Sequence, residues 1–216
     1  MRSLAAILLL ACSATATGQV AQTRAGSSTQ SSFGGQMVLD ELAAFGKCYA
    51  ATERKDSMAL VNTRPGSVEE LKTYKQLFRK PYQSCLGSVT RLSVSPFMVR
   101  GAVAEGMYHK RIPVPANLAV ANAPTPEKVK NLSEAAICYA GRHREAVQSL
   151  VERTKPGTKE EFDAVMALSP TLSECIPPAA SKTLQIDATM VRFRLAEALW
   201  RLGATPRQPN GLGAHQ

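Results

Sequence analysis

The chain has 216 residues, of which 44% are hydrophobic and 20% charged, and its formal net charge is +9. Such a chain can bury one substantial core, so one or two domains are expected and wholesale disorder is excluded. The basic balance favours anionic partners in general. No G-x-S-x-G, H-E-x-x-H, phosphate-loop or dinucleotide motif is present, so the sequence specifies no reaction and we expect no cofactor.

The first segment has the pattern of a signal peptide over residues 1–18. A positive start at Arg2 precedes an apolar run that ends at Ala11, and small residues such as Ala14 and Ala16 follow. The run is shorter than the ~20 residues that span a bilayer, so no transmembrane segment is expected. This pattern predicts a periplasmic or secreted protein. The second choice is an outer-membrane lipoprotein acylated at Cys12, because residues 9–12 resemble a lipoprotein cleavage box.

A flexible linker is predicted over residues 19–35, which are rich in Gly, Ser, Thr and Gln. After it, two segments match in order at a nearly constant offset of 90 to 92 positions. Cys48-Tyr49-Ala50 corresponds to Cys138-Tyr139-Ala140, and Met98-Val99-Arg100 to Met190-Val191-Arg192. We interpret this as a tandem duplication, with one copy at 36–110 and the other at 127–203.

Each copy is predicted to hold three helices, which makes the fold class all-α. The first helix spans about 37–62 and 127–154, and a Pro-Gly pair ends it. Capping boxes then start the second helix, at Ser67 with Glu70 and at Thr158 with Glu161. The third helix starts after Ser95 and after Asp187 as N-caps, with Pro96 at the first helical position and Gly203 closing the last helix.

The remaining segments are connections. Residues 92–94 and 184–186 read as extended and are candidates for a minimal β bridge between the copies. Residues 111–126 form a Pro-rich linker, and residues 204–216 a disordered tail.

Four cysteines follow the leader, an even number that predicts disulfides in an oxidising compartment. The second helix runs back along the first, which brings Cys85 level with Cys48 and Cys175 level with Cys138. We therefore predict the pairs Cys48–Cys85 and Cys138–Cys175. A metal or redox site would need a close cysteine pair or neighbouring histidines, and the sequence has neither.

The candidate binding residues are charges repeated in the third helix of both copies: Arg100 with Glu105, and Arg192 with Glu197. Within each helix the two side chains lie about 140° apart, too far to pair with each other. One interpretation is an ion pair between helices, Arg100 with Glu197 and Arg192 with Glu105, across a pseudo-two-fold axis. The other is an anion or carboxylate site in a groove.

Other patterns have plainer explanations. We expect Tyr49 and Tyr139 to pack against the disulfides. The basic cluster Lys72, Lys75, Arg79 and Lys80 is expected to be a solvated face, and its lack of interleaved aromatics argues against nucleic acid. The pattern of Phe193, Arg194, Trp200 and Arg201 also suits a membrane-surface helix, but core packing explains it more simply.

The stretch 92–108, with its core S-P-F-M-V-R-G-A-V-A-E-G-M-Y, and the stretch F-G-K-C ending at Cys48 resemble uncharacterised exported helical proteins of sphingomonad-type alphaproteobacteria. The resemblance covers about residues 42–202. The second copy departs from it where Phe193 and Arg194 replace Gly101 and Ala102. The resemblance implies bacterial export and a helical fold, and it implies no activity.

These observations predict an exported, non-catalytic helical binding or structural protein whose partner is an anionic envelope component or a protein. The alternative is an unfamiliar envelope-directed enzyme that uses the Arg/Glu pairs. A solvent-lined cavity around the four charges favours the enzyme, and burial with mutual bonding favours the binding protein.

Overall fold

The computed structural model describes residues 33–78, 85, 94–176, 187–204 and 206, with the side chains of residues 33–37 excepted. Within these residues the chain forms eight α-helices and two short 3-10 helices, with no strand. The predicted all-α class is confirmed. The predicted signal peptide, nearly all of the predicted tail and the predicted β bridge, apart from Val94, lie outside the described residues.

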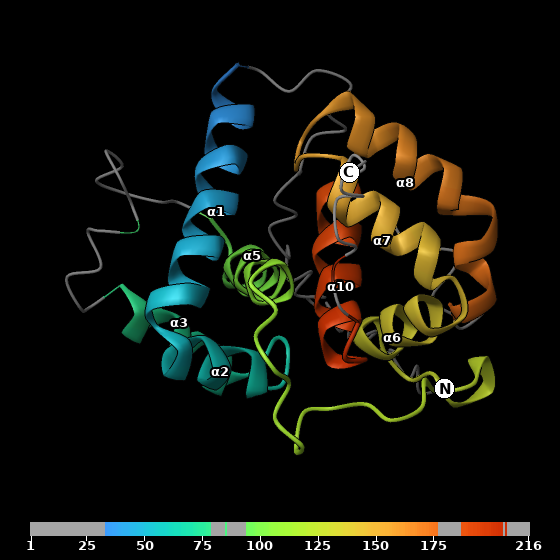
Figure 1. Ribbon diagram of the computed structural model, residues 1–216, viewed down its shortest axis with the longest axis horizontal. Helices are drawn as coiled ribbons and strands as arrows, with labels where there is room; N and C mark the ends of the chain where they lie inside the picture. The colour runs from blue at the N-terminus through green and yellow to red at the C-terminus, as the bar shows by residue number, and fades with distance from the viewer. Residues whose placement is uncertain (1–32, 79–84, 86–93, 177–186, 205, 207–216) are drawn as a thin grey trace, which may run out of the picture.

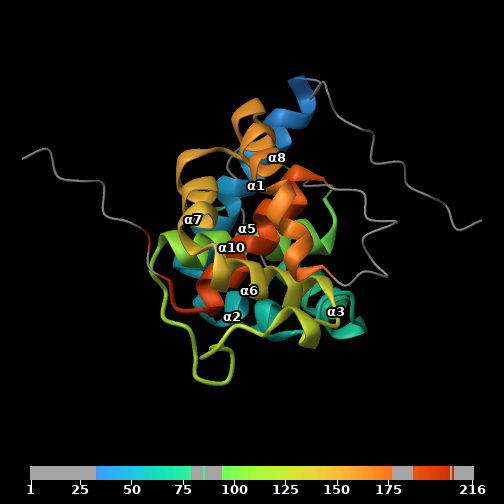
Figure 2. The ribbon, with the colours of Figure 1, turned by 90° about the vertical axis from the view of Figure 1, so that its right-hand side faces the viewer.

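The first four helices make the N-terminal half of the molecule: α1 (Phe33–Thr52), α2 (Arg54–Asn62), α3 (Val68–Leu77) and α5 (Pro96–His109). The C-terminal half has α6 (Leu132–Arg142), α7 (Arg144–Arg153), α8 (Lys159–Leu172) and α10 (Ala188–Arg201). The 3-10 helix η1 (Pro126–Lys128) precedes α6, and η2 (Ser173–Cys175) follows α8 directly. Helices α5 and α10 pack against each other in the middle, with the other helices around them (Figures 1 and 2).

The first helix of each half is interrupted, where the sequence predicted one continuous helix. The break lies at Glu53 in the N-terminal half (φ −117°, ψ 54°) and at His143 in the C-terminal half (φ −121°, ψ 41°). Neither residue is a glycine or proline, and Gly141, two residues before the second break, corresponds to Ala51 in the first half. A local helix breaker therefore does not account for both breaks, and we attribute them to packing common to the two halves. Among the described residues each half therefore holds four α-helices, where the sequence predicted three. The bend lets α2 and α7 turn their C-terminal ends toward the central helices.

The start of the second half also differs from the prediction. The helix expected from residue 127 begins only at Leu132, because Asn131 caps it by accepting hydrogen bonds from the N–H groups of Ser133 and Glu134, both 3.0 Å. At the other end of the chain, α1 begins at Phe33, inside the segment expected to be linker.

The predicted capping boxes are present in a shifted form. The N–H of Glu70 donates to Ser67 Oγ at 3.1 Å, and the N–H of Glu161 donates to Thr158 Oγ1 at 3.2 Å. Each glutamate reaches one residue beyond the cap, where Oε2 accepts the N–H of a glycine at 2.6 Å, that of Gly66 in one half and Gly157 in the other. Both glycines have left-handed φ, 78° and 77°, so the Pro-Gly turns need glycine there.

The central helices begin as predicted. Ser95 Oγ accepts the N–H of Met98, with Pro96 in the first turn, and Asp187 Oδ1 accepts the N–H of Met190 at 2.8 Å. Gly203 ends α10 with a φ of 65°.

The predicted Pro-rich linker lies packed on the molecule. Its residues Ile112 and Leu118 are buried, and the indole N–H of Trp200 donates to the carbonyl of Ile112 at 2.8 Å. The N–H of Val120 donates to the carbonyl of Arg201 at 2.9 Å. The linker thus joins the end of α5 to the end of α10.

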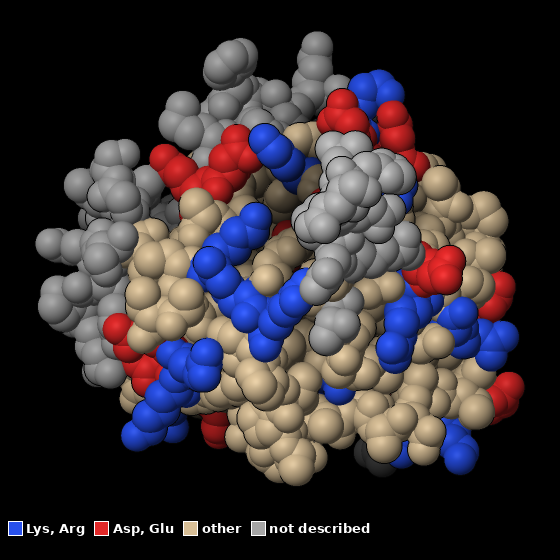
Figure 3. Space-filling model, in the orientation of Figure 1, with Lys and Arg blue, Asp and Glu red and all other residues tan. Residues whose placement is uncertain are grey.

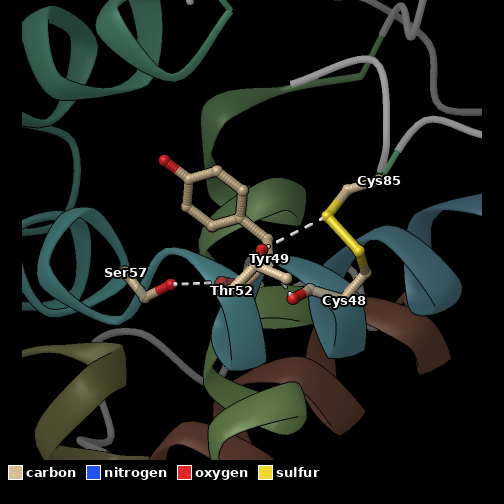
Figure 4. Close-up of a disulfide and its surroundings, with 5 residues drawn as sticks. All are labelled: Cys48, Tyr49, Thr52, Ser57 and Cys85. Carbon is tan, nitrogen blue, oxygen red and sulfur yellow. Dashed lines mark hydrogen bonds between the residues drawn. A yellow bond between two sulfur atoms is a disulfide. The ribbon is translucent and has the colours of Figure 1, made fainter. Parts of the chain in front are cut away.

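Both predicted disulfides are confirmed. Cys48 pairs with Cys85 and Cys138 with Cys175, at Cα separations of 5.5 and 5.9 Å and a sequence separation of 37 in each case. Figure 4 shows the first bridge with the hydroxyl of Thr52 directed at Cys85 Sγ, 3.5 Å away. Tyr49, next to Cys48, is buried in the core.

Close backbone contact sets the packing of the central helices. A Cβ on Gly46 of α1 would overlap the carbonyl of Ala102 in α5, and a Cβ on Gly106 would overlap the carbonyl of Gly46. Between the halves, a Cβ on Gly101 of α5 would overlap the side chain of Phe193 in α10. A small residue on one central helix therefore receives a large one from the other.

Candidate functional site

Arg100 is fully buried and binds both carboxylate oxygens of Glu197, through Nε at 2.9 Å and Nη2 at 2.8 Å. It also donates to Glu70 Oε1 of α3 at 3.4 Å, and its other hydrogen bonds go to the C-terminal end of α2. Nη1 donates to the carbonyls of Leu60 and Thr63, both at 3.0 Å, and Nη2 donates to that of Val61 at 2.7 Å. The side chain links α5, α2 and α10 at one point.

Arg192 repeats this arrangement in the C-terminal half. Its Nε and Nη2 bind Glu105 at 2.9 and 2.8 Å. Its other donors reach the end of α7, at the carbonyls of Leu150 (3.0 Å) and Val151 (2.7 Å). The two central helices thus form reciprocal ion pairs, in which each arginine binds the glutamate of the other helix.

This geometry identifies what the four charges do in the folded chain. The last carbonyls of a helix have no partner within it and carry the negative end of its dipole, so a guanidinium there satisfies both. All four side chains are at most 5% exposed. They form an orienting network inside the protein, and they do not surround a solvent-lined cavity.

The ionisation of the two paired glutamates follows from their partners. Burial raises the pKa of Glu197, but the hydrogen bonds and charge of Arg100, with the charges of Arg201 and Arg194, outweigh burial and hold this pKa below its usual range. Burial likewise opposes ionisation of Glu105, and His109 and Arg192 together lower its pKa. Both carboxylates are therefore held as anions in the interior.

The two capping glutamates differ from each other. Glu70 Oε1 lies 3.4 Å from Arg100 Nη1, whereas Glu161 Oε1 lies 3.9 Å from Arg192 Nε and accepts no hydrogen bond from the described part of the chain. Burial raises the pKa of Glu161. The C-terminal half thus has the weaker version of this contact.

The other residues singled out in the sequence lie in different environments. Tyr139 stacks on His143, with ring centroids 4.5 Å apart, and its hydroxyl bonds Thr171. Lys72 and Lys75 are exposed, while Arg79 and Lys80 lie outside the described residues. Phe193 and Trp200 are buried in the core, as the packing interpretation predicts.

Two further kinds of feature are absent from the described residues. None of the helices among them is both long and apolar enough to cross a bilayer. Within the same residues, no group of three or more His, Cys, Asp or Glu side chains is arranged to hold a metal ion.

A groove of about 310 Å³, which the sequence did not reveal, lies where the two halves meet. It is lined by the 62–65 turn between α2 and α3, by the first turns of α6 and by one face of α10. Its charged lining residues are Arg64, Glu134, Arg194, Glu197 and Arg201. Three segments distant in the sequence contribute to it, so no local pattern could have predicted it.

Two of its arginines are held in place by the protein. Arg194 donates from Nη1 to Ser133 Oγ at 3.0 Å, and its guanidinium carbon lies 4.1 Å from the ring centroid of Phe97. Arg201 donates from Nε to Glu197 at 2.9 Å and from Nη2 to the carbonyl of Val61 at 2.6 Å. The groove therefore presents guanidinium groups in fixed orientations.

Basic side chains also gather on the face seen in Figure 3, over the end of α5 between α1 and α10.

No protein family, curated protein or solved structure matches the chain in comparisons of sequence and structure. A function for the chain therefore has to be inferred from the geometry of its own residues.

Proposed function

We propose that the chain is an exported, non-catalytic helical protein that binds an anionic component of the bacterial envelope through the surface between its two halves. The observation that carries this proposal is the buried exchange of Arg100–Glu197 and Arg192–Glu105. These four charged side chains, which an enzyme could have used for proton transfer, hold the helices together. We therefore assign the binding function to the surface of the protein.

Export is supported by two features. The leader pattern at residues 1–18 predicts secretion. Two disulfides, each closing a loop of the same length, suit an oxidising compartment. We place the protein in the periplasm or outside the cell, with an acylated Cys12 as the second form.

We further infer that the two halves arose by duplication of one helical unit. The sequence correspondence is supported by equivalent contacts in the fold: the same disulfide spacing, the same shifted capping boxes and the same exchange of charges. The meeting place of such halves is a surface that neither unit has alone, and the groove lies there.

Export is tested by expressing the full chain with its own leader in an alphaproteobacterium and fractionating the cells. We expect the processed protein in the periplasm or medium, with its intact mass showing cleavage after residue 16 or 18. A mass that includes a lipid on Cys12 would select the lipoprotein form. An unprocessed cytoplasmic product with free thiols would contradict export.

Binding is tested by co-sedimentation of the mature, disulfide-bonded protein with purified cell-wall sacculi and with anionic phospholipid vesicles. At low ionic strength we expect the protein to pellet with one of these materials and to be released by high salt, because surface charges are screened. Vesicles of neutral lipid are the control. Failure to pellet with either anionic material would contradict the proposed function.

A further inference from the structure

We propose that the groove lined by the 62–65 turn, α6 and α10 is a binding site for the oxyanion group, carboxylate or phosphate, of a small ligand. That the ligand comes from the bacterial envelope rests on the function proposed above. The site itself is argued from the side chains that line it.

Arg194 is a half-buried cation on which the carboxylate of Glu197 acts only from a distance. Among the described residues no acidic side chain lies within salt-bridge distance of it, and its one protein hydrogen bond uses Nη1. Its Nε and Nη2 are left without a partner in that part of the chain. Burial lowers the pKa of Arg194, the opposite of the shift found for the paired Arg100. An anion at this place would supply the missing charge.

Two further arginines extend the same wall. Arg201 lies two turns beyond Arg194 on α10, and its Nη1 makes no hydrogen bond to the described residues. Arg64 enters from the 62–65 turn, is exposed, and has no ion pair within the described chain. Since protein contacts already fix Arg194 and Arg201, little side-chain entropy is lost when an anion binds them.

The acidic residues of the groove do not cancel this charge. Glu134 accepts the N–H of Lys130 at 2.8 Å and the amide of Asn131 at 2.9 Å. Glu197 shares its charge with Arg201 and with Arg100, which lies behind the groove wall. The lining thus keeps a net positive charge. The arginine groups that make no hydrogen bond to the described residues are all N–H donors.

The ligand class follows from this chemistry and from the size of the groove. A guanidinium presents a planar fork of N–H donors that matches carboxylate and phosphate oxygens. The volume of about 310 Å³ lies at the small end of ligand pockets, and Pro65, Ile137 and Ala198 add apolar contact. We therefore expect a small organic anion or a single anionic substituent of a larger molecule.

The test is an NMR titration of the mature protein that follows the side-chain Nε–H signals of its arginines. Sodium acetate and inorganic phosphate are added separately at constant ionic strength. We expect a saturable shift of the Arg194 signal. Acetate alone causing it would select a carboxylate, phosphate alone would select a phosphate, and competition between the two would show that the site takes either.

Matched variants locate the binding. Arg64→Gln and Arg194→Gln should each weaken binding by roughly ten- to a hundredfold, since a hydrogen bond to a charged group contributes about 1.5–3 kcal/mol. Arg144→Gln removes the same charge from an exposed position outside the groove and should leave the affinity unchanged. If Arg194→Gln proves unstable, the exposed Arg64 variant serves alone.

The inference is overturned if neither anion gives a saturable shift, or if the groove variants bind as tightly as Arg144→Gln does. Failure here is distinguishable from failure of the proposed function. If wild-type protein and Arg64→Gln pellet equally with sacculi or vesicles, envelope binding stands and the groove is not its site. If neither pellets but phosphate still binds, the site stands without the envelope.

Discussion

Arg111, which follows α5, has a left-handed φ of 54°, the only positive φ among the described non-glycine residues. Its N–H bonds to the carbonyl of Tyr108, and the N–H of Ile112 bonds to that of Met107, a pattern that Gly203 and Ala204 repeat at the end of α10. The same helix ending is thus made with glycine in one half and with arginine in the other.

Arg111→Gly should therefore stabilise the protein by about 0.5–1 kcal/mol, because the left-handed conformation costs a residue with a Cβ about 1–2 kcal/mol, partly offset by the chain entropy that glycine loses. Gly203→Ala is the converse and should destabilise by a similar amount. Urea unfolding at neutral pH measures both changes. A destabilised Arg111→Gly protein would show that the arginine side chain makes a compensating contact.

Glu161 and Glu70 offer a second comparison at this scale. Burial raises the pKa of Glu161, so its ionised form costs stability at neutral pH, and this cost disappears as the pH falls through the raised pKa. We expect Glu161→Gln to cost less stability at neutral pH than Glu70→Gln does, because the amide oxygen can still accept the N–H of Gly157 and Arg192 lies beyond hydrogen-bond distance. Glu70→Gln loses a charged hydrogen bond to Arg100 and should cost about 1.5–3 kcal/mol. Equal losses in thermal unfolding would contradict this difference.

At the scale of the helices, most of the architecture could be predicted from local signals. Serine, threonine or aspartate before α3, α5, α8 and α10, Pro-Gly after α2 and α7, and the cysteine spacing are short-range patterns. The structure contains the caps and both bridges that they predict. The breaks at Glu53 and His143 could not be predicted in this way. No glycine or proline occupies either break, and Gly141, which precedes the second break, has no counterpart in the first half. The breaks place α2 and α7 so that Arg100 and Arg192 can reach the carbonyls at their ends.

The two candidate sites also differ in whether the sequence could predict them. The Arg/Glu exchange was within reach of the sequence, because helical geometry forbids pairing within one helix and leaves few partners. The groove was not, because Arg64 and Arg194 come together only after the halves dock. Arg194 and Arg201 were seen in the sequence only as part of a packed helix.

The contact between the two central helices gives a test of equivalence. Gly101 and Phe193 occupy matching positions of the two halves and pack against each other. Gly101→Phe alone should clash, and Phe193→Gly alone should leave a cavity that costs about 3–5 kcal/mol. If the halves are equivalent, the double variant restores a large side chain against a small one and should be more stable than either single variant. A double variant less stable than both would contradict the equivalence.

The disulfides give the corresponding test for the outer helices. Both bridges close loops of the same length, so removal of either pair by Cys→Ala should destabilise the protein by a similar amount, about 3–4 kcal/mol in the chain-entropy model. Chemical unfolding of the two paired variants measures this. Loss of one bridge with no effect on stability would mean that its helices are held by packing alone.

At the scale of the whole molecule, the two halves are joined through buried charge as well as through apolar packing. Each central helix supplies one arginine and one glutamate, and each ion pair crosses from one half to the other. Breaking one partner of such a pair leaves an uncompensated charge in the core, which typically costs 3–5 kcal/mol. The docking of the halves should therefore depend on the ionisation of Glu105 and Glu197.

The pKa values of both glutamates are lowered in the folded chain, so they contribute stability that is complete above the ordinary glutamate pKa of about 4.3 and is lost as the pH falls through their folded values. We expect the melting temperature to fall steeply below about pH 4. A variant with Arg100→Met and Glu197→Leu, which removes both partners of one pair, should show a shallower fall, because one titrating carboxylate is gone. In this variant Arg201 keeps its hydrogen bond to the carbonyl of Val61, and Glu70 keeps the one from the N–H of Gly66. Calorimetry between neutral and acid pH measures both profiles, and identical acid dependence in the two proteins would show that Glu197 does not couple the halves to pH.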